Sequence, residues 1–346
     1  MRIMKRSIGV DLHKSAFTVC YYESESKHEF KTYQVNMRSL EYFKKTLKKT
    51  DELAVESTGN TAFFVREIQD KVKRVRVVNP FQFKVISSSV KKTDEKDALT
   101  IARFLQKDMI PEVRQRTEEE SQVASLIGTR DKFVKLRTSM KNKIHNILNA
   151  QGIVTKLEMF SSEKGLEKVL KLDVGNSYRF EIELIVAQIR NLNDAISKVA
   201  EELKARSQEL PGHKNLVSIK GISDTGATIF LNTIGNISDF RDEKALASYF
   251  GIVPRVWVSN QTVHHGRITK LGNKIARTAL VQSTLVAIRY SPYLRAFYDK
   301  IKARKGGGKA IIATSRKMLG IIYNTLKNNW VFEDFTRFKL APACAG

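Results

Sequence analysis

Cysteine and long apolar runs are both scarce in this sequence. The 346 residues include two cysteines, Cys20 and Cys344, which excludes a framework of structural disulfides and fits a reducing compartment. The apolar stretch near the amino terminus is interrupted by Asp11, His13 and Lys14, which argues against a cleaved signal peptide. No segment approaches the roughly 18 apolar residues that cross a bilayer. We therefore expect a cytoplasmic protein without a membrane segment.

Acidic residues are also scarce relative to basic ones. The chain has 60 Lys and Arg against 36 Asp and Glu, a formal net charge of +24. Such an excess attracts polyanions and raises the rate of encounter with nucleic acid. An anionic membrane surface is the weaker alternative, because no strongly basic amphipathic anchor stands out. The charge is compatible with both DNA and RNA, and no RRM- or KH-like signature singles out RNA.

The first hundred residues alternate short apolar strands with amphipathic helices. Strands are predicted over residues 7–12, 17–22, 29–35, 52–56 and 75–78. Helices are predicted over residues 37–49, 61–71 and 93–106. This order predicts an α/β domain over residues 1–112, with a mixed sheet flanked by helices.

Apolar residues at heptad spacing mark a second region, residues 113–210. In its first half they are Leu126, Phe133, Met140 and Ile147, with Leu136 and Ile144 between them. In its second half they are Ile182, Ile185, Ile189, Leu192, Ile196, Val199 and Leu203. The spacing is typical of a coiled coil or a long helical hairpin, and an ordinary bundle core fits equally well. Residues 151–177 are the expected hairpin tip, and the region is expected to bridge domains or subunits.

The last part of the chain is expected to be mostly helical. Residues 211–335 form this carboxy-terminal domain, with a turn-and-strand region at residues 249–272 and a glycine turn at residues 306–308. Residues 336–346 are expected to be a flexible tail.

Four acidic residues in the first domain form a candidate metal site. Asp11 lies inside an apolar run, where a carboxylate is costly unless it meets a cation or a strong donor, and Glu56 ends the run ELAVE. Asp94 and Asp97, three residues apart, share one face of the predicted helix, although either alone fits a surface acid near a helix N-terminus. Together the four carboxylates suit two Mg²⁺ ions, with Mn²⁺ as a substitute, and paired ions assist phosphoryl transfer.

This arrangement, D…E…D-x-x-D, resembles the RuvC-like, ribonuclease-H-type domain at the front of IS110-family transposases. The resemblance is carried by IGVDLHK, AVESTGN, VVNPFQFK and KKTDEKDALTIARF. It implies a ribonuclease-H-like fold, Mg²⁺ and a DEDD tetrad, which by motif position is Asp11, Glu56, Asp94 and Asp97. Asn60-Thr61 departs from the family, which often has an aromatic residue there, and we expect this to affect packing more than chemistry.

A second motif begins at FGIVP, residues 250–254, and ends in a helix after Asn273. It resembles the domain shared by IS110-, IS116- and IS902-like transposases, in which the serine after the G-x-x-P-R stretch is the nucleophile. The resemblance assigns that role to Ser259. The family usually has Gly after this serine whereas this chain has Asn260, so Thr262 is the nearest competitor. The cations expected to clamp phosphates are Arg255, Arg267, Lys270 and Arg277.

The two resemblances together imply DNA cleavage and rejoining through a covalent phosphoserine intermediate, assisted by Mg²⁺ at the tetrad. Members of the family use a structured noncoding RNA of the element to choose donor and target DNA, so both DNAs and this guide RNA are the implied partners. A homo-oligomer, a dimer or a tetramer, is also expected, because recombination must hold two duplexes. His264 and His265 are not expected to bind zinc, since no cysteine or third histidine is near.

Two other functions remain open at the level of sequence. One is a RuvC-like endonuclease in which water attacks the phosphate and the carboxy-terminal domain only binds. The other is a non-catalytic nucleic-acid-binding protein, for which four carboxylates at this spacing would be a coincidence.

Overall fold

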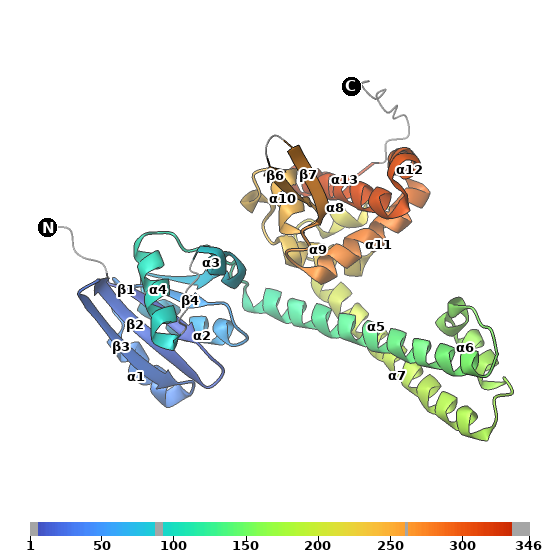
Figure 1. Cartoon of the computed structure of the whole chain (residues 1–346), viewed down its shortest axis with the longest axis horizontal. Helices are drawn as coiled ribbons and strands as arrows, with labels where there is room; N and C mark the ends of the chain where they lie inside the picture. Colours follow the sequence, from blue (N-terminus) through green and yellow to red (C-terminus); the bar gives the residue numbers. More distant parts are fainter. Residues whose placement is uncertain (1–5, 87–92, 260–261, 334–346) are drawn as a thin grey trace. The chain divides into compact units, whose positions relative to one another are not determined.

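The computed structural model describes residues 6–86, 93–259 and 262–333, and the predicted tail, residues 336–346, lies outside them. The chain forms two compact units, Met1–Thr117 and Glu118–Gly346, whose elements are labelled in Figure 1. None of the helices in these described ranges combines the length and apolarity that a membrane span requires.

The first unit is built on a five-stranded sheet with the order β3-β2-β1-β4-β5. The strands are β1 (Ser7–Leu12), β2 (Ala16–Ser24), β3 (Lys27–Gln34), β4 (Glu52–Glu56) and β5 (Arg74–Val78). β2 runs antiparallel to β1 and β3, whereas β4 runs parallel to β1 and β5. The predicted mixed sheet is confirmed. Because β1 and β4 are parallel neighbours, their carboxyl ends meet at the same edge.

The helices of this unit are α1 (Met37–Thr46), α2 (Thr61–Ile68), α3 (Pro80–Ile86) and α4 (Asp94–Gln106). α1 ends three residues earlier than predicted, because Leu47 takes an extended backbone and packs against the core. The predicted helix 61–71 finishes as a separate 3-10 turn, Gln69–Lys71. α3 was not predicted: Pro80 suits the first turn of a helix, and the Asn79 Oδ1 accepts from the backbone N–H groups of Phe81 and Gln82.

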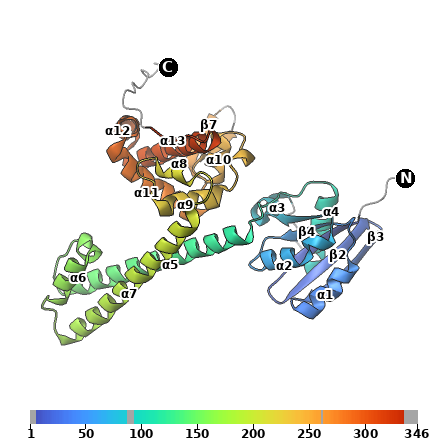
Figure 2. The same ribbon diagram turned by 180° about the vertical axis from the view of Figure 1, so that it is seen from behind.

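Side chains alternate between the two faces of the sheet. Ile8, Val10 and Leu12 of β1 are buried on the face covered by α1 and α2, which Figure 2 shows from behind. On the other face α4 lies against the backbone of β1 at Gly9: a Cβ there would lie 2.0 Å from the Ala98 carbonyl oxygen and 2.6 Å from the Ala102 nitrogen. Glycine at this position therefore sets how closely the helix approaches the strand.

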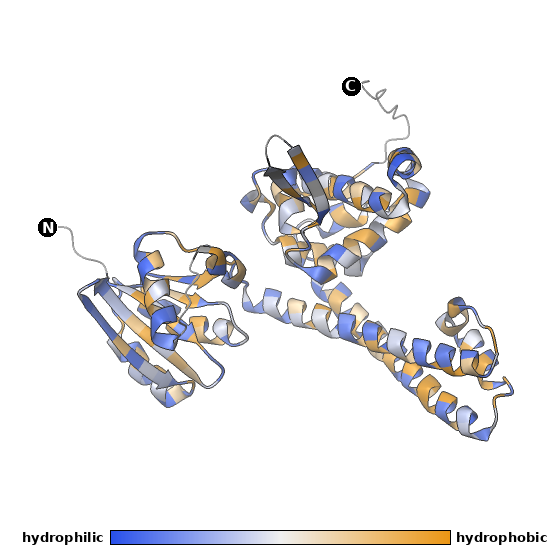
Figure 3. Cartoon of the chain, viewed as in Figure 1, coloured by the Kyte–Doolittle hydropathy of each residue, from blue (hydrophilic) through white to orange (hydrophobic). Residues whose placement is uncertain are grey.

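The second unit begins with two long helices, α5 (Glu118–Ala150) and α7 (Asn176–Ser207), which pack along each other. Short apolar and polar stretches alternate along both helices (Figure 3). At the tip they share a core with α6 (Glu163–Leu170) and a 3-10 turn, Leu157–Ser161. Leu136, a predicted seam residue midway along α5, is 41% exposed. The predicted apolar seam is thus not buried along its whole length, and a coiled coil remains a prediction.

The rest of the second unit is a helical domain with a two-stranded ribbon. Its helices are α8 (His213–Val217), α9 (Asp224–Ile234), α10 (Glu243–Tyr249), α11 (Lys274–Tyr290), α12 (Pro292–Lys305) and α13 (Gly307–Lys327). The ribbon consists of β6 (Pro254–Ser259) and β7 (Thr262–Ile268). The predicted turn at residues 306–308 is confined to Gly306, which has a φ of 77°, and Gly307 already belongs to α13.

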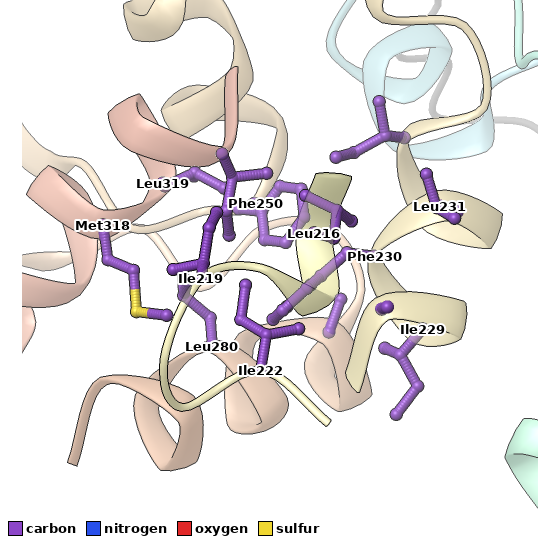
Figure 4. Packing of buried hydrophobic residues seen from close by; sticks show 14 of the residues in the cluster. Leu216, Ile219, Ile222, Ile229, Phe230, Leu231, Phe250, Leu280, Met318 and Leu319 are labelled. Atoms are coloured by element: carbon purple, nitrogen blue, oxygen red, sulfur yellow. The ribbon is translucent and has the colours of Figure 1, made fainter. Parts of the chain in front are cut away.

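One apolar core holds this helical domain together. Phe230, Phe250, Leu280 and Met318, from four separate segments, point toward one another in Figure 4. The same cluster includes Val123 and Ile127 of α5 and Leu203 of α7. The base of the helical hairpin is thus packed into the domain that follows it, and the core spans both sides of residue 210.

Replacing Gly9 by alanine is expected to destabilise the first unit by about 1–3 kcal/mol, because the new methyl group overlaps the backbone of α4. Denaturant unfolding of the full chain measures the change. Gly59→Ala is the matched control, because no atom lies within 4 Å of a Cβ built there. Equal stability of the two variants would contradict this account of the α4 contact.

Candidate functional site

Asp11 is the centre of an acidic cluster in the first unit. It lies near the carboxyl end of β1, on the same face as Gly9, and is 6% exposed. α4 packs against this face, and its first residue is Asp94. The contact at Gly9 therefore brings the first turn of α4 to the end of β1. Two carboxylates that are 83 positions apart in the sequence become neighbours for this reason.

His13 bridges these two carboxylates. Its Nε2 lies 3.2 Å from Asp11 Oδ2 and 3.4 Å from Asp94 Oδ1. One ligand atom from each of the three residues lies within 4.8 Å of the other two. A group of two carboxylate oxygens and one imidazole nitrogen at this separation can hold a divalent cation, and the oxygens suit a hard one. The donor set therefore fits the metal that the sequence predicts, with His13 as an additional member.

A negative charge on the Asp11 carboxylate is energetically unfavourable. Burial raises the pKa of Asp11 to about 6, and the carboxylates of Asp94, Asp97 and Glu56 act in the same direction. His13 opposes them, and its own pKa is raised, chiefly by the charge of Asp11. Two ionised carboxylates held close together favour a cation between them. The electrostatics thus agree with the geometry of the donor atoms.

Glu56 and Asp97 surround this centre without joining its closest group. Glu56 ends β4, next to β1, and shares the α4 face with Ala54. Asp97 follows Asp94 by three residues on α4. Both influence the charge on Asp11, although the set of atoms within 4.8 Å consists of Asp11, His13 and Asp94 in the described part of the chain. The structure thus gathers all four predicted acids at one edge of the sheet.

His13 was not predicted to be a site residue, and in the sequence it was considered only as an interruption of an apolar run. The signal was available: it follows Asp11 by two residues, and side chains two apart in extended chain lie on the same side. Its position is held by Asn60, whose Nδ2 donates to the His13 carbonyl oxygen at 2.9 Å. Asn60, where this chain departs from the family, therefore does more than fill space: it supports the loop that carries His13.

Ser259 lies in the second unit, at the end of β6. It is exposed and pairs across the ribbon with Thr262, which is also exposed. Residues directly opposite each other in an antiparallel pair share one face, so the two hydroxyl-bearing residues lie side by side. Thr262 therefore stays an alternative to Ser259 as the nucleophile. Asn260, which stands where the family usually has Gly, lies outside the described residues.

The predicted phosphate-binding cations differ in their surroundings. Arg255, Arg267 and Lys270 are exposed. Arg277 is partly committed to the fold, because its Nη1 donates to the carbonyl oxygens of Phe250 at 3.0 Å and Leu271 at 3.2 Å. Burial lowers the pKa of its guanidinium group. Arg277 thus helps to fix the segment between α10 and α11, where the ribbon is inserted.

A large basic groove begins at the base of the ribbon. Its volume is about 1320 Å³, and the apolar residues that line it include Ile252, Pro254, Ile268 and Ile312. The cations that line it are Arg267, Lys270, Arg304, Lys305, Lys309 and Arg316. None of its described lining residues is acidic. Sequence reasoning found two of these six cations; the other four come from α12 and α13, which the fold brings beside the ribbon.

The mixed sheet, covered by helices on both faces and with carboxylates gathered at one edge, fits the RuvC-like class of DEDD domains. Residues 8–152 match the DEDD transposase domain of the IS110 type, and residues 213–299 match the domain of the IS116/IS110/IS902 family. The two matches together cover most of the chain. The protein belongs to the IS110 family of transposases, which bind and recombine DNA.

Curated relatives match over nearly the whole length. The chain is 26% identical to the transposase for insertion sequence element IS1111A of Coxiella burnetii, over 92% of this chain and 89% of that protein. It is 25% identical to the pilin gene-inverting protein of Moraxella bovis, over 95% and 98%. The transposase for IS1328 of Yersinia enterocolitica is 23% identical, over 83% and 85%.

Replacing Asp11 by asparagine is expected to weaken divalent-cation binding by at least about 10-fold, because even residues that only support metal ligands contribute that much. Calorimetric titration of the full chain with Mg²⁺ and with Mn²⁺ measures the effect. Glu95→Gln is the control, since Glu95 lies exposed in the same turn of α4 as Asp94. Unchanged binding in the Asp11 variant would show that the metal is held elsewhere.

Proposed function

We propose that this chain is a DNA recombinase in which the Ser259 hydroxyl attacks a DNA phosphate and the acidic cluster holds a divalent cation at that phosphate. The observation that carries the proposal is the close group of Asp11, His13 and Asp94 at the end of β1. A buried carboxylate facing a second one is expensive unless a cation or strong donor is present. Family membership and the exposed hydroxyl at the end of β6 support the second half of the proposal.

The chemical step conserves the phosphodiester bond. The Ser259 Oγ loses its proton and forms a bond to phosphorus, while the bond from phosphorus to the leaving oxygen of the DNA strand breaks. The leaving oxygen takes up a proton and becomes a hydroxyl end. The result is a serine–phosphate diester, and the hydroxyl of another strand can reverse the step on that phosphorus. Cleavage and rejoining therefore need no external energy source.

The acidic cluster would hold the metal through Asp11 and Asp94, with Glu56 and Asp97 nearby. When bound, Mg²⁺ supplies Lewis-acid stabilisation of the charge that develops on the phosphate and lowers the pKa of the attacking hydroxyl. His13 has two roles consistent with its position: a ligand, or a cationic partner that neutralises the carboxylates. The proposal requires that this cluster and Ser259 act on the same phosphate.

The basic groove is the proposed path of the DNA backbone in the second unit. Six cations with no acidic neighbour among the described lining residues favour a polyanion. The volume of about 1320 Å³ exceeds that of typical small-ligand sites, about 300–1,000 Å³, which favours a polymer. Since the groove starts at the base of the ribbon, a strand held there would continue toward Ser259.

We also propose a structured guide RNA encoded by the element and a homo-oligomer, both of which rest on the family resemblance. The gene-inverting activity named for the Moraxella relatives supports site-specific recombination as the reaction class. A dimer or tetramer follows from the need to hold two duplexes. The paired helices α5 and α7 are the proposed oligomerisation region.

Ser259→Ala is expected to abolish covalent attachment of the protein to cleaved DNA, because the attacking oxygen is removed. Denaturing gels with labelled DNA, supplied with the guide RNA, detect the attachment, and mass spectrometry maps it. Thr262→Ala is the matched control, since Thr262 pairs with Ser259 across the ribbon. Attachment lost only in the Thr262 variant would transfer the role to that residue.

The same assay separates the other two functions. DNA cleavage that persists in Ser259→Ala, with free ends and no attached protein, would identify a hydrolytic endonuclease. Cleavage that is unchanged in Asp11→Ala would exclude a role for the acidic cluster in the reaction. A binding protein without catalysis would instead bind DNA and leave it uncut in both the wild type and Asp11→Ala.

Replacing Arg304 and Lys305 by alanine together is expected to weaken DNA binding about equally for all sequences and to reduce the salt dependence by about two ion contacts. Fluorescence anisotropy at several salt concentrations gives this slope. Arg295→Ala is the control, because Arg295 lies on the same helix and its Nε pairs with Asp299 Oδ2 at 2.8 Å. An unchanged slope in the double variant would remove the groove from the DNA path.

A further inference from the structure

The ribbon face that carries Ser259 also carries an exposed tryptophan. Trp257 precedes Ser259 by two residues on β6, so both side chains lie on the same face. Across the ribbon Trp257 pairs with His264, and Ser259 pairs with Thr262. Trp257 is 53% exposed, although a side chain of this size gains most from burial. An exposed aromatic ring beside a proposed nucleophile is typical of a surface that binds a ligand.

The indole ring is held flat against the ribbon. It stacks with the ring of His264, with centroids 5.8 Å apart and planes 19° from parallel. Beneath it lies Gly266, where a Cβ would come within 2.8 Å of the Trp257 ring. The absence of a side chain at Gly266 lets the indole lie close to the backbone. About half of the side chain, 53%, nevertheless remains exposed to solvent.

We propose that Trp257, supported by His264 and Gly266, is a stacking platform for an unpaired base of the DNA strand that Ser259 attacks. This inference rests on the proposed function, because it takes its substrate from the reaction at Ser259. The platform would fix the nucleotide next to the reacting phosphate, so Trp257 is a positioning residue.

The chemistry of the platform favours an unpaired base over other partners. A flat ring exposed on one face binds any base through its π-face, without reading its hydrogen-bonding groups. A base inside a duplex is stacked between its neighbours and cannot use such a surface. The basic groove at the base of the same ribbon supplies charge complementarity for the attached backbone. DNA is the occupant because the proposed serine chemistry acts on DNA.

The chain has two tryptophans, which provides a direct spectroscopic test. Trp330 is 56% exposed and lies beyond α13, so it matches Trp257 in exposure but not in location. Trp330→Phe leaves Trp257 as the sole tryptophan, and Trp257→Phe leaves Trp330. Single-stranded oligodeoxythymidylate is expected to quench the emission of the Trp330→Phe protein saturably and to leave that of the Trp257→Phe protein nearly unchanged.

The affinity for the same oligonucleotide gives the second readout. Trp257→Ala is expected to lower it by about 5- to 150-fold, the range for loss of one base–aromatic stack, whereas Trp257→Phe retains most of it. Val256→Ala is the matched control, because Val256 is also 53% exposed and points to the opposite face of the ribbon. Gly266→Ala, which displaces the ring without removing it, is expected to reduce the quenching.

Three results would overturn the proposal. One is equal quenching of the two single-tryptophan proteins, and another is equal quenching by an abasic oligonucleotide of the same length. The third is tighter binding and stronger quenching with the corresponding RNA, which would replace DNA as the occupant. Failure of the proposed serine chemistry is recognised separately. In that case the wild-type protein forms no covalent link to DNA, whereas the quenching experiment, which does not depend on cleavage, still reports base stacking on Trp257.

Discussion

The close approach of α4 to β1 is the contact on which the acidic cluster depends. Gly9 lacks a side chain, so the backbone of the helix near Ala98 and Ala102 rests on the strand. This contact fixes the depth and the position of the first turn of α4, and with it the place of Asp94 beside Asp11. Like charges brought together in this manner oppose folding. The unit therefore accepts an electrostatic cost at one edge of a well-packed sheet.

The two units present their reactive groups in opposite ways. The carboxylate of Asp11 is buried on a sheet, where packing limits its movement, as a preorganised metal ligand would require. The hydroxyl of Ser259 is exposed at the end of a two-stranded ribbon, where a long polymer can reach it. The helical core around Phe230 and Phe250 supplies the rigidity that the ribbon itself lacks. The proposed metal site and the proposed nucleophile for DNA have different needs, and each unit suits one of them.

Sequence reasoning succeeded where local patterns govern the outcome. The positions of the five strands along the chain, the mixed sheet and the grouping of Asp11, Glu56, Asp94 and Asp97 follow from apolar periodicity and motif spacing. The order of the strands within the sheet was not predicted. Sequence reasoning missed α3, because Asn79-Pro80 both ends a strand and begins a helix. It also missed most of the basic groove, namely the four cations that come from α12 and α13. Such a surface depends on tertiary packing, which residue spacing does not encode.

The length of α5 has a mechanical consequence. Its 33 residues, at about 1.5 Å each, extend for about 50 Å from a base packed in the helical core to a tip with its own core. A rotation of only about 10° at the base would move the tip by about 9 Å, given that rise per residue. Small changes in the packing of Val123 and Ile127 at the base therefore become large displacements of the tip. Conversely, a force applied at the tip acts on this packing through the length of the helix.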